Sequence, residues 1–199
     1  IFAHTGDNKW AEHLEMLGFN ALPATLSEDM WTHQYVQQVN QIACQKTMIM
    51  APWSTNGPYA HTFGLEPNFG CCTANFNQGW PKFALSSFMH KDNTVLSSVM
   101  LPSVLKDDGV IIRLETDYPF NNKMHYYIDA EKDFNFVIRI PSFAKNLKVN
   151  GENTEIKDLE FAITQGKTEV EIEFETTPYF KKRPNDLYVL QMGSLLFSV

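Results

Sequence analysis

Two adjacent cysteines are the residues of this sequence best suited to chemistry. Cys71 and Cys72 follow a loop-like segment and begin a stretch in which apolar residues recur at helical spacing. At the start of a helix, free backbone N–H groups and the positive end of the dipole lower the pKa of a thiol. A thiolate can attack a substrate or bind zinc, so the pair is a candidate for either role. A second interpretation stays open, because free cysteines are often small buried residues without chemistry.

The elements around the pair are predicted from apolar spacing and from proline and glycine. Residues 5–22 are expected to form a helix that ends at Pro23, and residues 71–89 a second helix. Residues 30–50 are predicted to be irregular with short extended pieces. Residues 51–70 contain three Pro and three Gly, which predicts a long loop leading to the cysteines.

The pattern changes near residue 91, where apolar residues begin to alternate with polar ones. We expect strands over residues 95–101, 110–115, 125–129, 134–141, 169–174, 187–190 and 195–199. Asn150-Gly151 lies between two short extended segments and is typical of a tight hairpin turn. Short strands separated by turn residues at this spacing indicate an antiparallel β-sandwich.

Composition excludes several classes of protein. The 199 residues are 44% apolar, which is enough for a sizeable core, and the net charge is −7. The 16 Lys and Arg residues form no block, whereas a nucleic-acid binder needs a concentrated basic surface. The longest apolar runs fall far short of the roughly 20 residues of a membrane span. We therefore expect no nucleic-acid partner and no membrane span.

The cysteine count and the two ends bear on location. Three cysteines, an odd number, argue against a disulfide scaffold and slightly favour the cytoplasm over secretion. The sequence starts at Ile1 and stops within an apolar, strand-like run. Because natural termini are usually polar, we interpret the sequence as an internal piece of a longer protein.

Residues 69–82, which carry Cys71-Cys72-Thr73-Ala74-Asn75, resemble the Cys-Cys-x-x-Asn segment of the DUF1680 proteins. This family includes the glycoside hydrolase family 127 (GH127) β-L-arabinofuranosidases. Residues 5–12 resemble the helix that follows the family's Glu-Thr-Cys motif, and residues 193–197 resemble a segment of its sandwich domain. The resemblance covers nearly the whole sequence in order, and its Cys-Cys-Thr-Ala-Asn variant is typical of a divergent branch.

The resemblance implies a fold and an activity. Residues 1–90 would be the C-terminal part of a helical (α/α)6 barrel, and residues 91–199 a β-sandwich that continues beyond the sequence. Cys71 would be the nucleophile of a retaining glycosidase and a zinc ligand, and Cys72 a second zinc ligand. The remaining Glu and Cys ligands, and the acid/base Glu, would lie upstream of residue 1.

Two further residues are candidates for binding the carbohydrate that the resemblance implies. Glu66 could line the sugar pocket, although an ordinary loop carboxylate is the simpler interpretation. His61 could form a hydrogen bond with a sugar hydroxyl. The simpler interpretation is that it has a structural role in its loop. We expect a glycoside hydrolase or, as the alternative, a non-catalytic carbohydrate-binding or structural protein with the same scaffold, in either case within a larger assembly or homo-oligomer.

Overall fold

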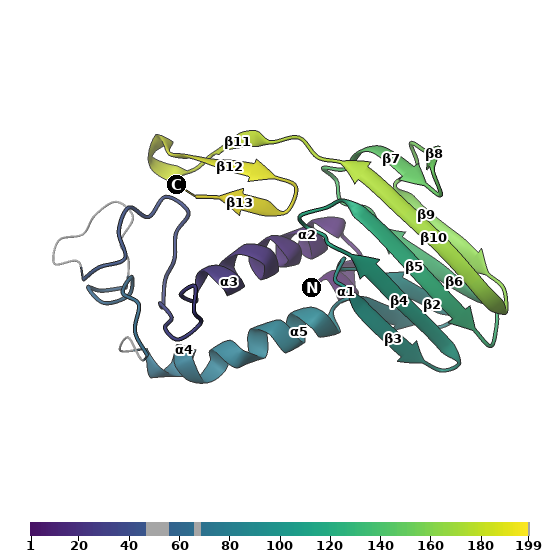
Figure 1. Ribbon diagram of the computed structural model, residues 1–199, viewed down its shortest axis with the longest axis horizontal. Coiled ribbons are helices and arrows are strands. Elements are labelled where there is room, and N and C mark those ends of the chain that lie inside the picture. The colour runs from purple at the N-terminus through teal and green to yellow at the C-terminus, as the bar shows by residue number, and fades with distance from the viewer. Residues whose placement is uncertain (47–55, 66–68, 199) are drawn as a thin grey trace. The chain divides into compact units, whose positions relative to one another are not determined.

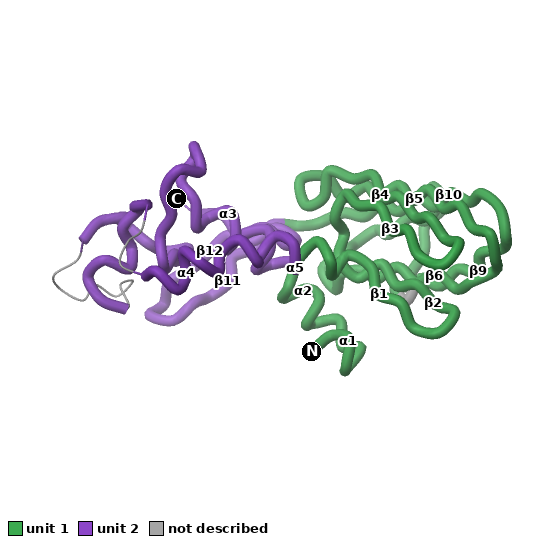
Figure 2. The backbone as a smooth tube through the Cα atoms, turned by 90° about the horizontal axis from the view of Figure 1, so that it is seen from below, with its two compact units in different colours: residues 1–14, 83–177 green, residues 15–82, 178–199 purple. Residues whose placement is uncertain are grey.

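A computed structural model describes residues 1–46, 56–65 and 69–198 of the chain (Figure 1). The chain divides into two compact units, each made of two separate stretches of sequence (Figure 2). Unit 1 comprises Ile1–Leu14 and Phe83–Thr177, and unit 2 comprises Glu15–Lys82 and Pro178–Val199. The domain boundary expected between residues 90 and 91 stays a prediction.

Unit 1 is built around two sheets that are mostly antiparallel. The four-stranded sheet has the order β1-β2-β6-β9, with β1 at Phe88–Lys91, β2 at Thr94–Ser97, β6 at Phe134–Arg139 and β9 at Asp158–Ile163. The six-stranded sheet has the order β3-β4-β5-β10-β7-β8, with β3 at Ser103–Asp107, β4 at Val110–Thr116, β5 at Lys123–Ala130, β10 at Gly166–Glu175, β7 at Lys145–Val149 and β8 at Glu152–Asn153. Strands β2 and β6 form a parallel pair, and no helix lies between them in the chain.

The core of unit 1 follows from strand alternation. Side chains in a strand point to opposite faces in turn, so every second residue of a half-buried strand is apolar. In β4, Ile112 and Leu114 are buried while Arg113 between them is exposed. Across the core, Phe136 of β6 meets Tyr126 of β5 edge to face, with ring centroids 5.3 Å apart. The two sheets therefore pack against each other, and the predicted mixed, mostly antiparallel fold class is confirmed at this level.

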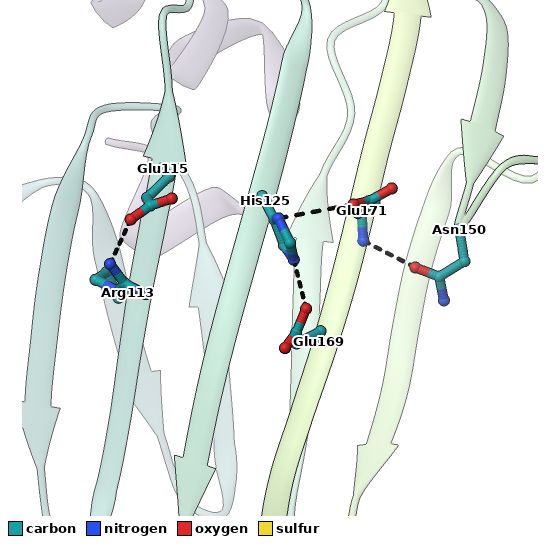
Figure 3. Close-up of polar contacts among 6 residues, drawn as sticks. All are labelled: Arg113, Glu115, His125, Asn150, Glu169 and Glu171. Atoms are coloured by element: carbon teal, nitrogen blue, oxygen red, sulfur yellow. Dashed lines mark hydrogen bonds and ion pairs between the residues drawn. The ribbon is translucent and has the colours of Figure 1, made fainter.

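The outer face of the six-stranded sheet is polar (Figure 3). His125 Nε2 lies 2.9 Å from a Glu169 carboxylate oxygen, and its Nδ1 lies 3.6 Å from one of Glu171. His125 also stacks on the ring of Tyr127. The Arg113 guanidinium carbon lies 4.3 Å from the centroid of the same Tyr127 ring. Partial desolvation, and then the negative charges nearby, raise the pKa of the Tyr127 hydroxyl. Cross-strand pairs of this kind explain how the sheet keeps one face in water.

The Asn-Gly hairpin predicted from the sequence joins β7 and β8. Asn150 and Gly151 both have positive φ, 49° and 83°, as the tight two-residue turn requires. The side-chain carbonyl oxygen of Asn150 accepts a hydrogen bond from the Glu171 backbone N–H at 2.8 Å (Figure 3). The turn is therefore tied to the neighbouring strand β10.

The N-terminal stretch of unit 1 is tied to a loop far away in sequence. Helix α1 (Phe2–Thr5) precedes α2 (Asn8–Met16), and Glu12 lies on α2. The two Glu12 carboxylate oxygens accept hydrogen bonds from the Ser142 backbone N–H at 2.5 Å and from its hydroxyl at 2.9 Å. These contacts fix residues 1–14 to the loop between β6 and β7.

The first predicted helix continues past its expected end. A π-helical turn, Leu17–Ala21, follows α2, and α3 (Leu22–Ala24) contains Pro23. The Leu22 N–H bonds to the Leu17 carbonyl, one residue further back than in an α-helix. This wider π-helical turn lies just before Pro23. The proline therefore does not end the helical segment, which continues to Ala24.

The second predicted helix is interrupted and shorter than expected. It consists of α4 (Gly70–Asn75), a 3-10 turn (Phe76–Gln78) and α5 (Gly79–Leu85). The prediction that it extends to Met89 is wrong, because Met89 lies in β1 and pairs with Leu96. Pairing with β2 in a tight hairpin has overridden the helical spacing here.

Unit 2 also contains a small antiparallel sheet. Its strands are β11 (Tyr179–Lys182), β12 (Tyr188–Met192) and β13 (Leu195–Phe197), with a 3-10 turn at Pro184–Asp186 between the first two. Asn20, in the π-helical turn, donates to the Ser194 carbonyl and accepts from the Leu196 N–H, both at 2.8 Å. Among the described residues, no helix is long and apolar enough to cross a bilayer.

Candidate functional site

The two adjacent cysteines lie at the start of helix α4. Cys71 is exposed and Cys72 is half-buried, and their sulfur atoms are 3.6 Å apart. Two sulfur ligands on a tetrahedral zinc ion, each at about 2.3 Å, stand about 3.8 Å from each other. The distance between the two sulfur atoms is therefore close to that between two thiolate ligands of one zinc ion.

Helix α4 has a weak start. Its first turn begins at Phe69, whose side chain makes no capping hydrogen bond. The Phe69 carbonyl accepts from the N–H groups of Cys72, at 2.9 Å, and Thr73, at 3.2 Å. A six-residue helix with such a start is not stable by itself, so tertiary contacts must hold the cysteines in place.

Side chains one turn apart support the helix from its C-terminal side. The Asn75 side chain donates to the Cys71 carbonyl at 2.7 Å. Gln78 in turn donates to Asn75, and Lys82 donates to Gln78, both at 2.8 Å. This series connects the cysteine helix to α5 by neighbouring side chains.

The segment of residues 33–36, which bends at Tyr35, contacts the start of α4. The rings of Tyr35 and Phe69 are stacked, with centroids 3.9 Å apart and planes inclined by 4°. His33 Nε2 lies 2.9 Å from the Thr73 hydroxyl. Neither contact was predictable from the sequence, since the residues that meet are more than 30 positions apart.

The two thiols differ in their surroundings. Desolvation raises the pKa of the Cys72 thiol above its ordinary value, and the neighbouring Cys71 raises it further. Without a cation nearby, the neutral thiol is therefore the favoured form of Cys72.

His61 lies in the interior of unit 2. Its side chain is fully buried, and Nδ1 lies 3.1 Å from the side-chain carbonyl oxygen of Gln41. Gln41 also donates to the Cys44 sulfur at 3.1 Å, and Cys44 is exposed. A sugar contact by His61 stays a prediction, and Cys44 belongs to this separate cluster.

The other candidate, Glu66, lies outside the described residues. Among the residues that the structure describes, no group of three or more His, Cys, Asp or Glu side chains is placed to hold a metal ion.

Residues 95–175 match the family model of the β-L-arabinofuranosidase GH127 middle domain. This match lies entirely within unit 1 and covers β2 to β10. It confirms the resemblance to GH127 found in the sequence, and it assigns the middle domain to the two-sheet unit. The cysteine pair lies outside the matched segment.

Solved structures of glycoside hydrolases share the fold of the chain. A protein described as a glycoside hydrolase is 18% identical, with a TM-score of 0.72, over 96% of this chain and 34% of its own. A GH127 β-L-arabinofuranosidase from Geobacillus stearothermophilus T6 is 18% identical, with a TM-score of 0.67, over 98% of this chain and 33% of its own. A further GH127 β-arabinofuranosidase is 21% identical, with a TM-score of 0.69, over 98% and 34%.

The chain thus spans about a third of the length of these structures. No curated protein matches the sequence.

Proposed function

We propose that this chain is part of a retaining glycoside hydrolase of the GH127 type, in which Cys71 is the nucleophile. The observation that carries the proposal is the pair of thiols at the start of α4, 3.6 Å apart with Cys71 exposed. The GH127 resemblance and the shared fold support it. In this proposal, the helices within residues 1–90 are the end of an (α/α)6 barrel, and the substrate is an L-arabinofuranoside.

The first step forms a bond between the Cys71 sulfur and the anomeric carbon of the sugar. The thiolate supplies the electron pair, and the bond between the anomeric carbon and the glycosidic oxygen breaks. A carboxylic acid upstream of residue 1 donates a proton to the leaving oxygen. The product is a thioglycosyl enzyme and a free alcohol.

The second step returns the enzyme to its starting state. The same carboxylate, now deprotonated, takes a proton from water, and the water oxygen attacks the anomeric carbon. The carbon–sulfur bond breaks and the thiolate leaves. Two inversions at one carbon give net retention of configuration.

Zinc is the cofactor that this thiol pair fits. Cys71 and Cys72 would supply two of its ligands, and the resemblance places a Glu and a Cys upstream of residue 1 as the other two. Bound zinc keeps thiols deprotonated near neutral pH. For Cys72, whose pKa is raised in the chain alone, this effect is in the direction that catalysis requires.

The alternative is a non-catalytic carbohydrate-binding or structural protein. The match at residues 95–175 is to a middle-domain model, so it fits this alternative as well as the enzyme. A scaffold can retain its sandwich while losing the chemistry of its barrel.

The test uses the full-length protein with Cys71→Ser, Cys72→Ser and, as the matched control, Cys44→Ser. Hydrolysis of an aryl β-L-arabinofuranoside is followed together with zinc content by elemental analysis. We expect Cys71→Ser to lose about 10³-fold or more in kcat, and Cys44→Ser to stay within about two-fold of the wild type. Mass spectrometry with a slow substrate should find the sugar on the peptide that contains Cys71.

Three outcomes would contradict the proposal. They are hydrolysis that survives in Cys71→Ser, a sugar adduct on a residue other than Cys71, or oligosaccharide binding without hydrolysis in the wild type. The last would establish the non-catalytic alternative.

A further inference from the structure

The short helix that carries the cysteines is contacted from one side by the segment of residues 33–36. This segment has its own fixed position in unit 2. The backbone of His33 exchanges two hydrogen bonds with Gly64, both 3.1 Å, and the Gln34 N–H donates to the Thr25 carbonyl at 3.0 Å. The Val36 N–H donates to the Ala60 carbonyl at 2.9 Å. Backbone hydrogen bonds from neighbouring segments therefore hold this segment in place.

Alternation along this segment sends its side chains in two directions. Gln34 is 5% exposed, and its side chain donates to the Ala24 carbonyl at 3.3 Å. His33 and Tyr35, on the opposite side, contact Thr73 and Phe69. The Gln34 side chain thus attaches the segment to the rest of unit 2, while the His33 and Tyr35 side chains contact α4.

The two contacts lie on either side of the cysteines in the chain. Tyr35 stacks on Phe69, the residue before the first helical position of α4, and His33 contacts Thr73, the residue after Cys72. The Thr73 N–H itself bonds to the Phe69 carbonyl, so the two contacts hold the two ends of one turn, and both cysteines lie within that turn.

We propose that His33 and Tyr35 form a clamp on α4, in which His33 acts through the Thr73 hydroxyl as a positioning residue for the two thiols. The clamp holds the two ends of the first turn, where no side chain caps the helix. Without it, the bonds from Cys72 and Thr73 to the Phe69 carbonyl open more often, and the spacing of the sulfur atoms is no longer fixed. The geometry of the clamp stands on contacts alone, whereas its role in catalysis rests on the proposed function.

The test measures the opening of the first turn in the full-length protein. Amide hydrogen exchange is followed by mass spectrometry in peptides that cover residues 69–76. Thr73→Val and His33→Leu each remove one side of the contact at similar volume. Because a hydrogen bond of this kind contributes modestly to stability, we expect exchange to be about 2- to 10-fold faster in each variant.

Rescue and coupling separate a specific contact from general damage. Thr73→Ser keeps the hydroxyl, and we expect exchange within about 1.5-fold of the wild type. The double variant His33→Leu with Thr73→Val should exchange no faster than either single variant, because both remove the same bond. Thr62→Val is the matched control, since the Thr62 hydroxyl donates to the Tyr59 carbonyl at 2.8 Å and does not belong to the clamp. It should leave exchange at residues 69–76 unchanged.

A second measurement separates the clamp from the proposed chemistry. Zinc affinity, by chelator competition, should fall about 2- to 10-fold in Thr73→Val and be restored in Thr73→Ser. The single and double variants could show non-additive effects on exchange while neither the wild type nor any variant binds zinc or hydrolyses a glycoside. That result would support the clamp and overturn the proposed function. Additive effects of the two single variants, or a Thr73→Ser protein that behaves like Thr73→Val, would overturn the clamp whatever the activity.

Discussion

The hydroxyl groups of Ser97 and Tyr126 lie 2.9 Å apart in the interior of unit 1, where they join its two sheets. Ser97 lies on β2 of the four-stranded sheet and Tyr126 on β5 of the six-stranded sheet, and both are almost completely buried. A buried hydroxyl needs a partner, so this bond specifies which residues face each other across an otherwise apolar core.

Tyr126→Phe is therefore expected to destabilise unit 1 by about 1–2 kcal/mol, because the Ser97 hydroxyl loses this partner in a place that water does not reach. Tyr127→Phe, on the outer face of the same strand, is the control and should cost less than about 0.5 kcal/mol. Urea denaturation followed by circular dichroism measures both. Equal losses in the two variants would contradict the role of the Ser97 bond.

Gly151→Ala should destabilise the β7–β8 hairpin by about 1 kcal/mol. Gly151 has a φ of 83°, a conformation that costs energy for a residue with a Cβ, although no atom lies within 4 Å of the position that a Cβ would take. The loss is therefore one of backbone strain and not of crowding. Thermal denaturation measures it, and Asn153→Ala, in the adjoining strand, serves as the control. A Gly151→Ala protein as stable as the wild type would show that the turn relaxes.

The ion pair between Asp108 and Lys132 should make a small contribution to stability that depends on pH. The hydrogen bond from Lys132, and then its charge, lower the pKa of the Asp108 carboxyl in the folded protein. A lowered folded pKa stabilises the fold at pH values above the unfolded pKa, about 3.9, and the contribution is lost as pH falls through the folded value. Lys132→Met should thus lower the melting temperature at pH 7, and the difference should shrink as the pH falls below the unfolded pKa and disappear once Asp108 is protonated in the folded protein. Both side chains are exposed, so the effect should also shrink in 1 M salt.

The 199-residue chain alone should not hold zinc tightly or cleave glycosides. Of the four ligands in the proposed site, only Cys71 and Cys72 lie in the chain, and two thiolates leave half of the tetrahedral shell to water. Much of the roughly 10–16 kcal/mol with which structural zinc sites bind would be lost. Elemental analysis of the chain, beside the full-length protein and Cys71→Ser forms of each, measures this. One tightly bound zinc per isolated chain, absent in Cys71→Ser, would show that the ligand set is complete within it.

Strands were predictable where one face is buried and the other is wet. The alternation of β4, β5, β6 and β10 appears directly in the sequence, and the Asn150-Gly151 turn is a local signal that needs no partner. Strand β9 carries the same alternation at Leu159, Phe161 and Ile163, so its signal was present although it was not identified. Strand β1 had no such signal, because its residues continue the apolar spacing of the preceding helix. Its pairing with β2 decides its structure.

The parallel pairing of β2 with β6 was not predictable either. The choice of partner depends on the path of β3, β4 and β5 through the other sheet, which no local pattern records.

At the candidate site, the two cysteines were identified from the sequence. The sequence did not identify His33 or Thr73, because a contact between residues 40 positions apart depends on the tertiary path of the chain. Tyr35 was an aromatic residue without a known neighbour until the structure placed its ring against Phe69.

The contact between Glu12 and Ser142 has a consequence for the order of events during translation. The two residues are 130 positions apart, and ribosomes add about 5–20 residues per second. Residues 1–14 therefore leave the ribosome roughly 6 to 26 seconds before the loop that receives them exists. The contacts of unit 2 form later, because Asn20 and its partner Ser194 are separated by 174 positions. Unit 1 can therefore close before unit 2, whose small sheet is complete only after β12 and β13 have been made.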